Sequence, residues 1–343
     1  MRREQRPEVV VITGASAGIG RAVAREFAAH GARIGLLARG EAGLQGAKHD
    51  VEALGGQAMA IPTDIADYEE VERAAETVEQ AFGPIDIWIN DGFVTVFAEF
   101  TAITPAEYRR VTEVTYLGFV HGTLAALKRM LPRDHGHIVQ VGSALGYVSI
   151  PLQSAYCGAK HAILGFSNSV RIELMHHHSN VSLSVAHLPA VNTPQFTWGR
   201  DKLPYLPQPV PPIYAPEVVA RGIYWLAHQR KKRELWIGLA SVRSILGAKF
   251  APGLTQRYLA RVGYRSQMRD QPNVGDRSDN LSYPLDATRD YGAHGVFDAQ
   301  ERRGSPQLWV AEHKGLLALT CAAAGLASAA GIALAAGAFP RRD

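Results

Sequence analysis

Three side chains with complementary acid–base properties stand at short spacings near the middle of the chain. Tyr156 and Lys160 are four residues apart, and Ser143 lies thirteen residues before the tyrosine. On a helix, the phenol and the amine would share one face. A free tyrosine has a pKa of about 10, and a nearby ammonium is expected to lower it. Tyr156 is therefore a candidate general acid and base, and Ser143 a candidate hydrogen-bond donor to an oxygen whose charge changes.

A glycine-rich turn near the N-terminus is the second chemical feature. It follows the first apolar run, 9–12, and reads Thr13-Gly14-Ala15-Ser16-Ala17-Gly18-Ile19-Gly20. A strand that passes through such a turn into a helix presents free N–H groups and a positive dipole end, which attract a pyrophosphate. Glycines permit the tight turn and the close approach of ligand or strand. The turn predicts a dinucleotide site that includes Thr13, Gly14, Ser16, Gly18, Ile19 and Gly20.

The end of the second expected strand bears on the choice of cofactor. An NAD site favours a carboxylate here, which binds the ribose 2′-hydroxyl, but Ala38 offers none. The next residue, Arg39, carries a planar guanidinium that suits a 2′-phosphate. We therefore expect NADP(H), bound in part by Arg39. The alternative is that Arg39 is simply an exposed residue at a strand end.

The elements that must position these residues alternate over the first 240 residues. Short β-rich runs alternate with amphipathic stretches, which is typical of a parallel sheet with helices on both faces. The expected strands are 9–13, 33–38, 57–61, 85–90, 137–143, 182–188 and 235–238. The expected helices are 19–30, 41–54, 68–82, 105–130, 154–178 and 216–228. This pattern predicts an α/β fold with a Rossmann-like, doubly wound parallel sheet.

With these features in place, residues 8–240 resemble the short-chain dehydrogenase/reductase family in its single-domain form. Ser143, Tyr156 and Lys160 match the catalytic serine, tyrosine and lysine of that family. The resemblance implies that Lys160 also holds the nicotinamide ribose. It implies self-association through the two long helices expected at 105–130 and 154–178. It also implies further cofactor contacts at Asp64, Ile65, Asn90, Pro189 and Thr193.

The chain departs from the family pattern at two places. The family usually has Asn-Asn-Ala-Gly where this chain has Asn90-Asp91-Gly92-Phe93, and the bulkier Phe93 is expected to narrow the space below the cofactor. An asparagine that holds a water of the family's proton relay is replaced by Thr115. Either the threonine hydroxyl still holds a water, or the relay is altered. Both outcomes affect the rate more than the class of reaction.

Apolar side chains between the serine and the tyrosine bear on the substrate. They suit a pocket for a lipophilic carbonyl or alcohol, although ordinary core packing explains them equally well. They are Leu145, Tyr147, Val148, Ile150 and Leu152. The three adjacent histidines at 176–178 would point in different directions on a helix, so we expect a solvated helix end and no metal site.

The composition excludes several classes of function. The 343 residues are 47% hydrophobic, and the net charge of +4 is scattered, so no nucleic-acid partner is expected. The two cysteines, Cys157 and Cys321, are far apart, which predicts no disulfide and fits a reducing compartment. The apolar run 9–12 is too short for a signal peptide. We therefore expect the catalytic domain in the cytoplasm.

The pattern changes after the catalytic domain at 1–240. Residues 241–306 are expected to form a C-terminal extension that becomes irregular from Gly263. The tail, 307–343, contains 24 uncharged residues at 316–339. As a helix this stretch is long enough to cross a hydrocarbon core of about 30 Å. We expect a membrane anchor here; the alternative is an alanine-rich helix that packs in solution or in a dimer.

Together, these features predict an NADP(H)-dependent oxidoreductase that interconverts a carbonyl and an alcohol on a lipophilic small molecule, with Tyr156 as general acid and base. A first alternative is a nucleotide-binding scaffold without turnover, motivated by Thr115 and the altered stretch 90–93. A second is an isomerase or dehydratase on the same fold. Net consumption of the cofactor during turnover separates an oxidoreductase from the second alternative.

Overall fold

A computed structural model of the protein describes residues 6–275 and 277–313. Residues up to Gly304 form one compact unit, and a second unit begins at Ser305. In the second unit the structure describes one short helix, α11 (Pro306–Glu312), and the hydroxyl of Ser305 caps it by accepting from the backbone N–H of Leu308.

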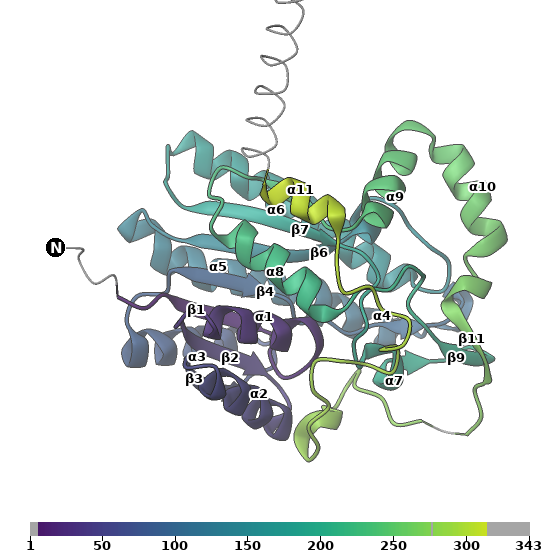
Figure 1. Ribbon diagram of the computed structural model, residues 1–343, viewed down its shortest axis with the longest axis horizontal. Helices are drawn as coiled ribbons and strands as arrows, with labels where there is room; N and C mark the ends of the chain where they lie inside the picture. The colour runs from purple at the N-terminus through teal and green to yellow at the C-terminus, as the bar shows by residue number, and fades with distance from the viewer. Residues whose placement is uncertain (1–5, 276, 314–343) are drawn as a thin grey trace, which may run out of the picture. The chain divides into compact units, whose positions relative to one another are not determined.

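A seven-stranded sheet forms the centre of the first unit, and all its strands are parallel (Figure 1). The strand order is β10-β7-β6-β4-β1-β2-β3, so the order reverses beside β1. In such sheets, ligands bind outside the carboxyl ends of the strands at the point of reversal. The strands are β1 (Val9–Thr13), β2 (Arg33–Ala38), β3 (Gln57–Pro62), β4 (Ile87–Asn90), β6 (His137–Ser143), β7 (Ser182–Leu188) and β10 (Glu234–Trp236). The predicted Rossmann-like sheet is confirmed.

Helices cover both faces of this sheet (Figure 1). Those of one face are α1 (Gly18–Ala28), α2 (Glu41–Ala53) and α8 (Pro216–Ala227). Those of the other face are α3 (Tyr68–Phe82), α5 (Gly118–Met130) and α6 (Ser154–His176). Because both faces are covered, every residue of β1, β4 and β6 is buried. Shorter elements are β5 (Val96–Phe97), α7 (Gln195–Trp198) and β8 (Arg200–Asp201).

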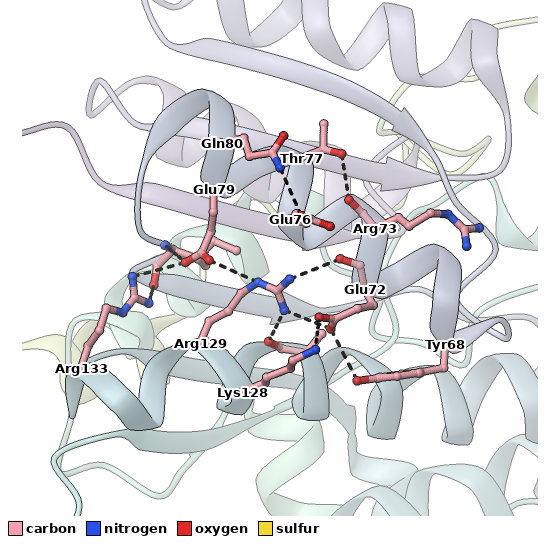
Figure 2. A network of polar contacts seen from close by, with 12 residues as sticks. Tyr68, Glu72, Arg73, Glu76, Thr77, Glu79, Gln80, Lys128, Arg129 and Arg133 are labelled. Atoms are coloured by element: carbon pink, nitrogen blue, oxygen red, sulfur yellow. Dashed lines mark hydrogen bonds and ion pairs between the residues drawn. The ribbon is translucent and has the colours of Figure 1, made fainter.

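An ion-pair network joins α3 to α5 (Figure 2). Glu72 accepts hydrogen bonds from Lys128 at 2.6 Å and from Arg129 at 3.0 Å. Glu79 pairs with Arg129 and Arg133, each at 3.3 Å. Burial alone would raise the pKa of Glu72, but the hydrogen bonds from Arg129 and Lys128 outweigh it and lower the pKa. The network thus fixes the two helices against each other on one face of the sheet.

The helix expected at 105–130 is present and contains one π-helical turn. α4 (Pro105–Thr112) begins with a capping box between Thr104 and Glu107, and a π-helical turn at Glu113–Leu117 separates it from α5. The sequence did not indicate this turn, because hydrophobic spacing does not register one turn of wider winding. Such turns are frequent at functional sites, and this one carries Thr115.

The C-terminal extension is more ordered than the sequence indicated. Within the stretch expected to be irregular, 263–306, β11 (Met268–Pro272) pairs antiparallel with β9 (Tyr205–Pro207). Before it, α9 (Leu239–Phe250) and α10 (Pro252–Val262) form a helical hairpin that extends from one end of the sheet (Figure 1). Pro252 begins the second helix, where its missing N–H is tolerated.

The predicted membrane anchor concerns the tail. Its residues, 316–339, lie outside the described part of the chain, and the prediction stays untested. Among the helices within 6–275 and 277–313, none is both long and apolar enough to cross a bilayer.

Candidate active site

Two adjoining spaces open at the carboxyl ends of the central strands. The first, here called the glycine-turn groove, is lined by the turn after β1 and by the ends of β2 and β3. The second, here called the tyrosine cavity, has a volume of about 670 Å³ and is lined by Ser143, Tyr156 and Lys160. Four residues line both spaces: Ile19, Asp91, Phe93 and Thr193. A ligand lying in the groove would therefore reach the cavity.

The glycines of the turn have steric roles. Gly14 and Gly18 have φ of +70° and +57°, a region that favours glycine. A Cβ on Gly14 would lie 2.7 Å from the Cα of Gly92, and a Cβ on Gly20 would lie 2.4 Å from the carbonyl oxygen of Gly14. The turn, the start of α1 and the end of β4 are therefore packed backbone against backbone. The start of α1 lines the groove, and this placement suits a pyrophosphate.

The structure separates the expected cofactor residues into three groups. Those that line the groove are Gly14, Ser16, Gly18, Ile19, Arg39, Asp64, Ile65 and Thr193. Thr13, Gly20 and Asn90 lie behind this lining, and Pro189 lines the tyrosine cavity instead. The hydroxyl of Thr13 accepts from the backbone N–H groups of Asp91 and Gly92 at 3.0 and 3.2 Å. Thr13 thus ties the end of β1 to the end of β4.

The side chain of Asn90 is buried in a polar cluster. It accepts from the indole N–H of Trp88 at 2.8 Å and donates to Gln140 at 2.9 Å. A Cβ on Gly122 would lie 2.1 Å from its amide oxygen, so α5 passes close beside it. Asn90 therefore supports β4, β6 and α5 beneath the site.

The far end of the groove is closed by residues that sequence reasoning missed. The guanidinium of Arg39 donates to the backbone carbonyls of Asn280, Leu281 and Ser282. Arg110 donates to the carbonyl of Leu281 at 3.1 Å. Burial lowers the pKa of Arg39 below its usual value. The C-terminal extension thus forms a wall at the end where an adenosine ribose would lie.

A carboxylate from the extension also lines this end. Asp286 is buried against the start of α2, where a Cβ on Gly40 or Gly43 would collide with its side chain. The stretch around Asp286 has weak periodicity, so nothing in the sequence pattern indicated its place. The glycines at 40 and 43 are the one sequence signal, because they mark a close approach of another segment.

The extension continues along the groove toward the nicotinamide end. The N–H of Gly18 donates to the carbonyl of Gly292 at 3.1 Å. Farther on, the side-chain amide of Asn192 donates to Asp298 at 2.7 Å and to Glu301 at 2.8 Å. We call residues 280–301 the covering segment. Its contacts follow the groove from Arg39 to the loop after β7.

The structure brings the three reactive residues together. Ser143 ends β6, and Tyr156 and Lys160 lie on α6. The hydroxyl of Ser143 accepts from the backbone N–H of Leu145 at 3.1 Å and lies close enough to Tyr156 to act on its pKa. The Nζ of Lys160 lies 5.5 Å from the centre of the Tyr156 ring and donates to the carbonyl of Val141 at 2.8 Å.

The charge states differ from the sequence-based expectation. Burial raises the pKa of Tyr156, and the hydroxyl of Ser143 opposes the rise only in part. Burial also lowers the pKa of Lys160, and the charge of Asp91 opposes that fall. The expectation that Lys160 lowers the pKa of Tyr156 was wrong for this structure, because desolvation of the phenolate is the larger effect. The raised pKa favours the protonated phenol at neutral pH.

The altered stretch 90–93 places an acid and an aromatic ring beside this pair. The ring of Phe93 meets that of Tyr156 edge to face, with centroids 5.6 Å apart. The carboxylate of Asp91 is buried, and this burial raises its pKa, opposed by the charge of Lys160 and by a hydrogen bond from the backbone of Gly20. The family pattern has an amide at position 91, so this carboxylate is a charge that the pattern does not carry.

Thr115 does not line either space. Its hydroxyl donates to the carbonyl of Val94 at 2.8 Å and accepts from the N–H of the same residue at 3.0 Å. The hydroxyl proton of Thr115 is therefore used in the hydrogen bond to the carbonyl of Val94 and is not donated to a relay water.

The apolar residues expected to line a substrate pocket lie in two different places. Leu145, Val148 and Ile150 line the tyrosine cavity. Tyr147 instead donates to Glu234 at 2.7 Å, and Leu152 packs in a small core with Phe97 and Leu203. The expected apolar lining thus holds for Leu145, Val148 and Ile150. The alternative, ordinary packing, holds for Tyr147 and Leu152. Sequence reasoning missed the part of the lining that comes from α9 and α10.

Comparison with known proteins gives concordant matches. The sequence pattern of the family described as short chain dehydrogenase matches residues 8–202. An uncharacterized oxidoreductase from Bacillus subtilis, YxnA, is 34% identical over 274 residues, which cover 79% of this chain and 76% of that protein. The 3-dehydrosphinganine reductase of Danio rerio is 33% identical over 192 residues. That match covers 54% of this chain and 57% of the reductase, so the chain spans little more than half of it.

Solved structures resemble the first unit. A metagenomic short-chain oxidoreductase in complex with NADP is 26% identical, with a TM-score of 0.57, and the match covers 67% of this chain and 96% of that one. A short chain dehydrogenase from Mycobacterium paratuberculosis, bound to NAD, has a TM-score of 0.61 at 24% identity and covers 69% of this chain and 98% of that one. The second likeness shows the fold alone.

Proposed function

The chain belongs to the short-chain dehydrogenase family, and on this premise we propose that it transfers a hydride between NADP(H) and a carbonyl/alcohol pair on a lipophilic small molecule. The observation that carries the proposal is the tyrosine cavity, where Ser143, Tyr156 and Lys160 meet beside a groove that suits a dinucleotide. A bound reduced nicotinamide would supply the hydride.

Each of the three side chains has a role in carbonyl reduction. The phenol of Tyr156 donates its proton to the substrate oxygen, whose negative charge grows as the carbonyl carbon is reduced. The hydroxyl of Ser143 donates a hydrogen bond to the same oxygen and stabilises that charge. The ammonium of Lys160, 5.5 Å from the Tyr156 ring centre, offsets the negative charge left on the phenolate. Oxidation of an alcohol reverses these steps.

The preference for NADP(H) rests on Arg39. Its guanidinium lines the groove at the end of β2, where Ala38 provides no carboxylate for a ribose hydroxyl. The metagenomic relative in complex with NADP supports the same preference. Asp286 lies at this end too, and its charge would oppose a 2′-phosphate. The guanidinium of Arg39 donates to carbonyls of the covering segment, so it would have to leave some of these bonds to bind the phosphate.

This preference is tested by titrating NADPH and NADH against the wild type and Arg39→Ala. Loss of a guanidinium–phosphate contact is expected to weaken NADPH binding by about tenfold or more, at a cost of about 1.5–3 kcal/mol for a charged hydrogen bond. NADH binding should change by less than about threefold. Equal losses for both cofactors would show that Arg39 supports only the covering segment, and would refute the preference.

The role of Tyr156 is tested with a panel of lipophilic ketones and NADPH. Removal of a general acid costs about 100-fold or more in kcat, and Tyr156→Phe should show that loss while still binding NADPH. The matched control is Tyr224→Phe, because Tyr224 lies on α8 and lines neither space. Reduction by Tyr156→Phe at nearly the wild-type rate would overturn the mechanism.

We further propose that the protein self-associates through α5 and α6 and that the segment 316–339 anchors it, with the catalytic domain in the cytoplasm. Support for self-association comes from large apolar side chains exposed on these helices: Leu124, Ile172 and Met175. A solution mass of one chain in the detergent-free protein would contradict the first part. Recovery of the full chain without membranes after cell fractionation would contradict the second.

A further inference from the structure

The hairpin formed by α9 and α10, residues 239–262, is one wall of the tyrosine cavity. Its residues that line the cavity are Ala240, Ser241, Arg243, Ser244, Gly247, Leu254, Thr255, Tyr258 and Leu259. The hairpin lies outside the family pattern matched at 8–202. It stands at the cavity and extends away from the sheet (Figure 1).

The hairpin exposes large apolar side chains. Phe250, at the end of α9, is 82% exposed, and Leu254 and Tyr258 of α10 are 67% and 63% exposed. Leu239 and Leu246 are exposed as well. Every residue of α10 is exposed or half-buried. Isolated exposed apolar residues are ordinary, but a group of them in one short segment marks a surface for interaction.

The same surface is cationic. The sequence has no acidic residue between Glu234 and Asp270. Arg243 and Lys249 on α9 and Arg257 and Arg261 on α10 are exposed. The net charge of the whole chain is only +4, so the hairpin concentrates positive charge beside its apolar side chains.

We propose that the hairpin docks on an anionic lipid bilayer and that the tyrosine cavity receives its substrate from that bilayer. Helices with exposed Phe, Leu or Tyr beside Arg and Lys lie in the membrane interface, where apolar side chains enter the acyl boundary and cations meet lipid phosphates. Leu254 and Tyr258 both line the cavity and face outward, which connects the docked surface to the reactive residues. The second half of this proposal rests on the proposed function.

Charge favours a bilayer over a second copy of the chain. Two such hairpins packed together would bring cation against cation, with no acid on either one to compensate. An anionic leaflet compensates the exposed Arg257 and Arg261 of α10, and each contributes about a fivefold increase in binding.

Hydrogen exchange of the full chain, followed by mass spectrometry, tests the docking directly. The protein is exposed to vesicles of phosphatidylcholine alone, or of two parts phosphatidylcholine and one part phosphatidylglycerol. We expect amides of 246–261 to become protected with the anionic vesicles only. Exchange of these amides reports contact made by the hairpin itself, so attachment of the chain through 316–339 alone would not protect them. Protection that appears on raising the protein concentration without lipid would overturn the proposal in favour of self-association.

Two variants and a matched control sharpen the result. Arg257→Glu/Arg261→Glu should raise the anionic lipid concentration needed for half protection by about 25-fold or more, and Phe250→Asp should raise it as well. Neither variant changes a residue that lines the cavity. Arg25→Glu/Arg73→Glu, with the same charge change on exposed positions of α1 and α3, should behave as wild type. An unprotected wild-type hairpin on anionic vesicles, or equal losses in the control, would refute docking.

Activity separates this proposal from the proposed function. The hairpin variants should reduce a water-soluble ketone as the wild type does and lose only the reduction of a ketone dissolved in anionic vesicles. If no ketone is reduced while the hairpin is protected, the proposed function fails and docking stands. If both ketones are reduced equally well by all variants, delivery from the bilayer fails and the proposed function stands.

Discussion

The carboxylate of Asp91 should set the pH range in which the reactive pair works. Lys160 is packed beneath the rings of Phe93 and Phe119, with its Nζ 5.5 and 4.7 Å from their centres. The groups that titrate beside it are Tyr156 and Asp91. Burial lowers the pKa of Lys160, and the charge of Asp91 holds its ammonium form. Asp91→Asn removes that charge with little change in shape, so the pKa of Lys160 should fall further.

The size of this fall follows from Coulomb's law. Opposite unit charges about 4–8 Å apart at an effective dielectric constant of about 20 attract by about 2–4 kcal/mol, and partial exposure to solvent reduces this. Since one pKa unit corresponds to about 1.4 kcal/mol, the pKa of Lys160 should fall by about one to two units. If turnover needs the ammonium of Lys160, the alkaline limb of the kcat/KM profile for ketone reduction should move to lower pH by the same amount.

The control for this prediction is Asp286→Asn. Asp286 lies in the same groove, but its carboxylate is not among the charges that act on Lys160. This variant should change the affinity for the dinucleotide and leave the alkaline limb in place. An unshifted limb in Asp91→Asn, or equal shifts in both variants, would show that Asp91 does not control the charge of Lys160.

Two further predictions concern stability and cofactor binding. Hydrogen bonds, led by the one from Lys202, outweigh the burial of Glu107 and lower its pKa to about 2. The ionised carboxylate therefore stabilises the folded protein above pH about 4.5, and this stabilisation is lost as the pH falls toward 2. Glu107→Gln should cost about 2–3 kcal/mol in urea unfolding at pH 7, and a loss that persists unchanged at pH 2 would contradict this cause. In Gly20→Ala, the new Cβ would lie 2.4 Å from the carbonyl oxygen of Gly14, so NADPH binding should weaken by about tenfold or more. The control is Gly165→Ala, which has open space around the new Cβ and should bind NADPH as the wild type does.

The sheet and the reactive residues were predictable because local patterns determine them. Alternating apolar runs and amphipathic stretches specify a covered parallel sheet, and the turn from Thr13 to Gly20 specifies where a ligand meets it. The spacing of Tyr156 and Lys160 places them on one helix face wherever the helix lies. The charge states were not predictable in the same way, since the raised pKa of Tyr156 depends on how much protein surrounds the ring.

The covering segment shows what the sequence could not indicate. Residues 280–301 lack periodicity, and their positions depend on single contacts with distant partners, such as the carbonyl of Gly292 with the N–H of Gly18 and Asp290 with Arg21. Such contacts have no fixed spacing along the chain, so no local pattern encodes them. The ligand must nevertheless pass this segment, because its contacts follow the whole groove. The residues shared with the family line the site, and the C-terminal extension forms the wall that a bound dinucleotide would meet.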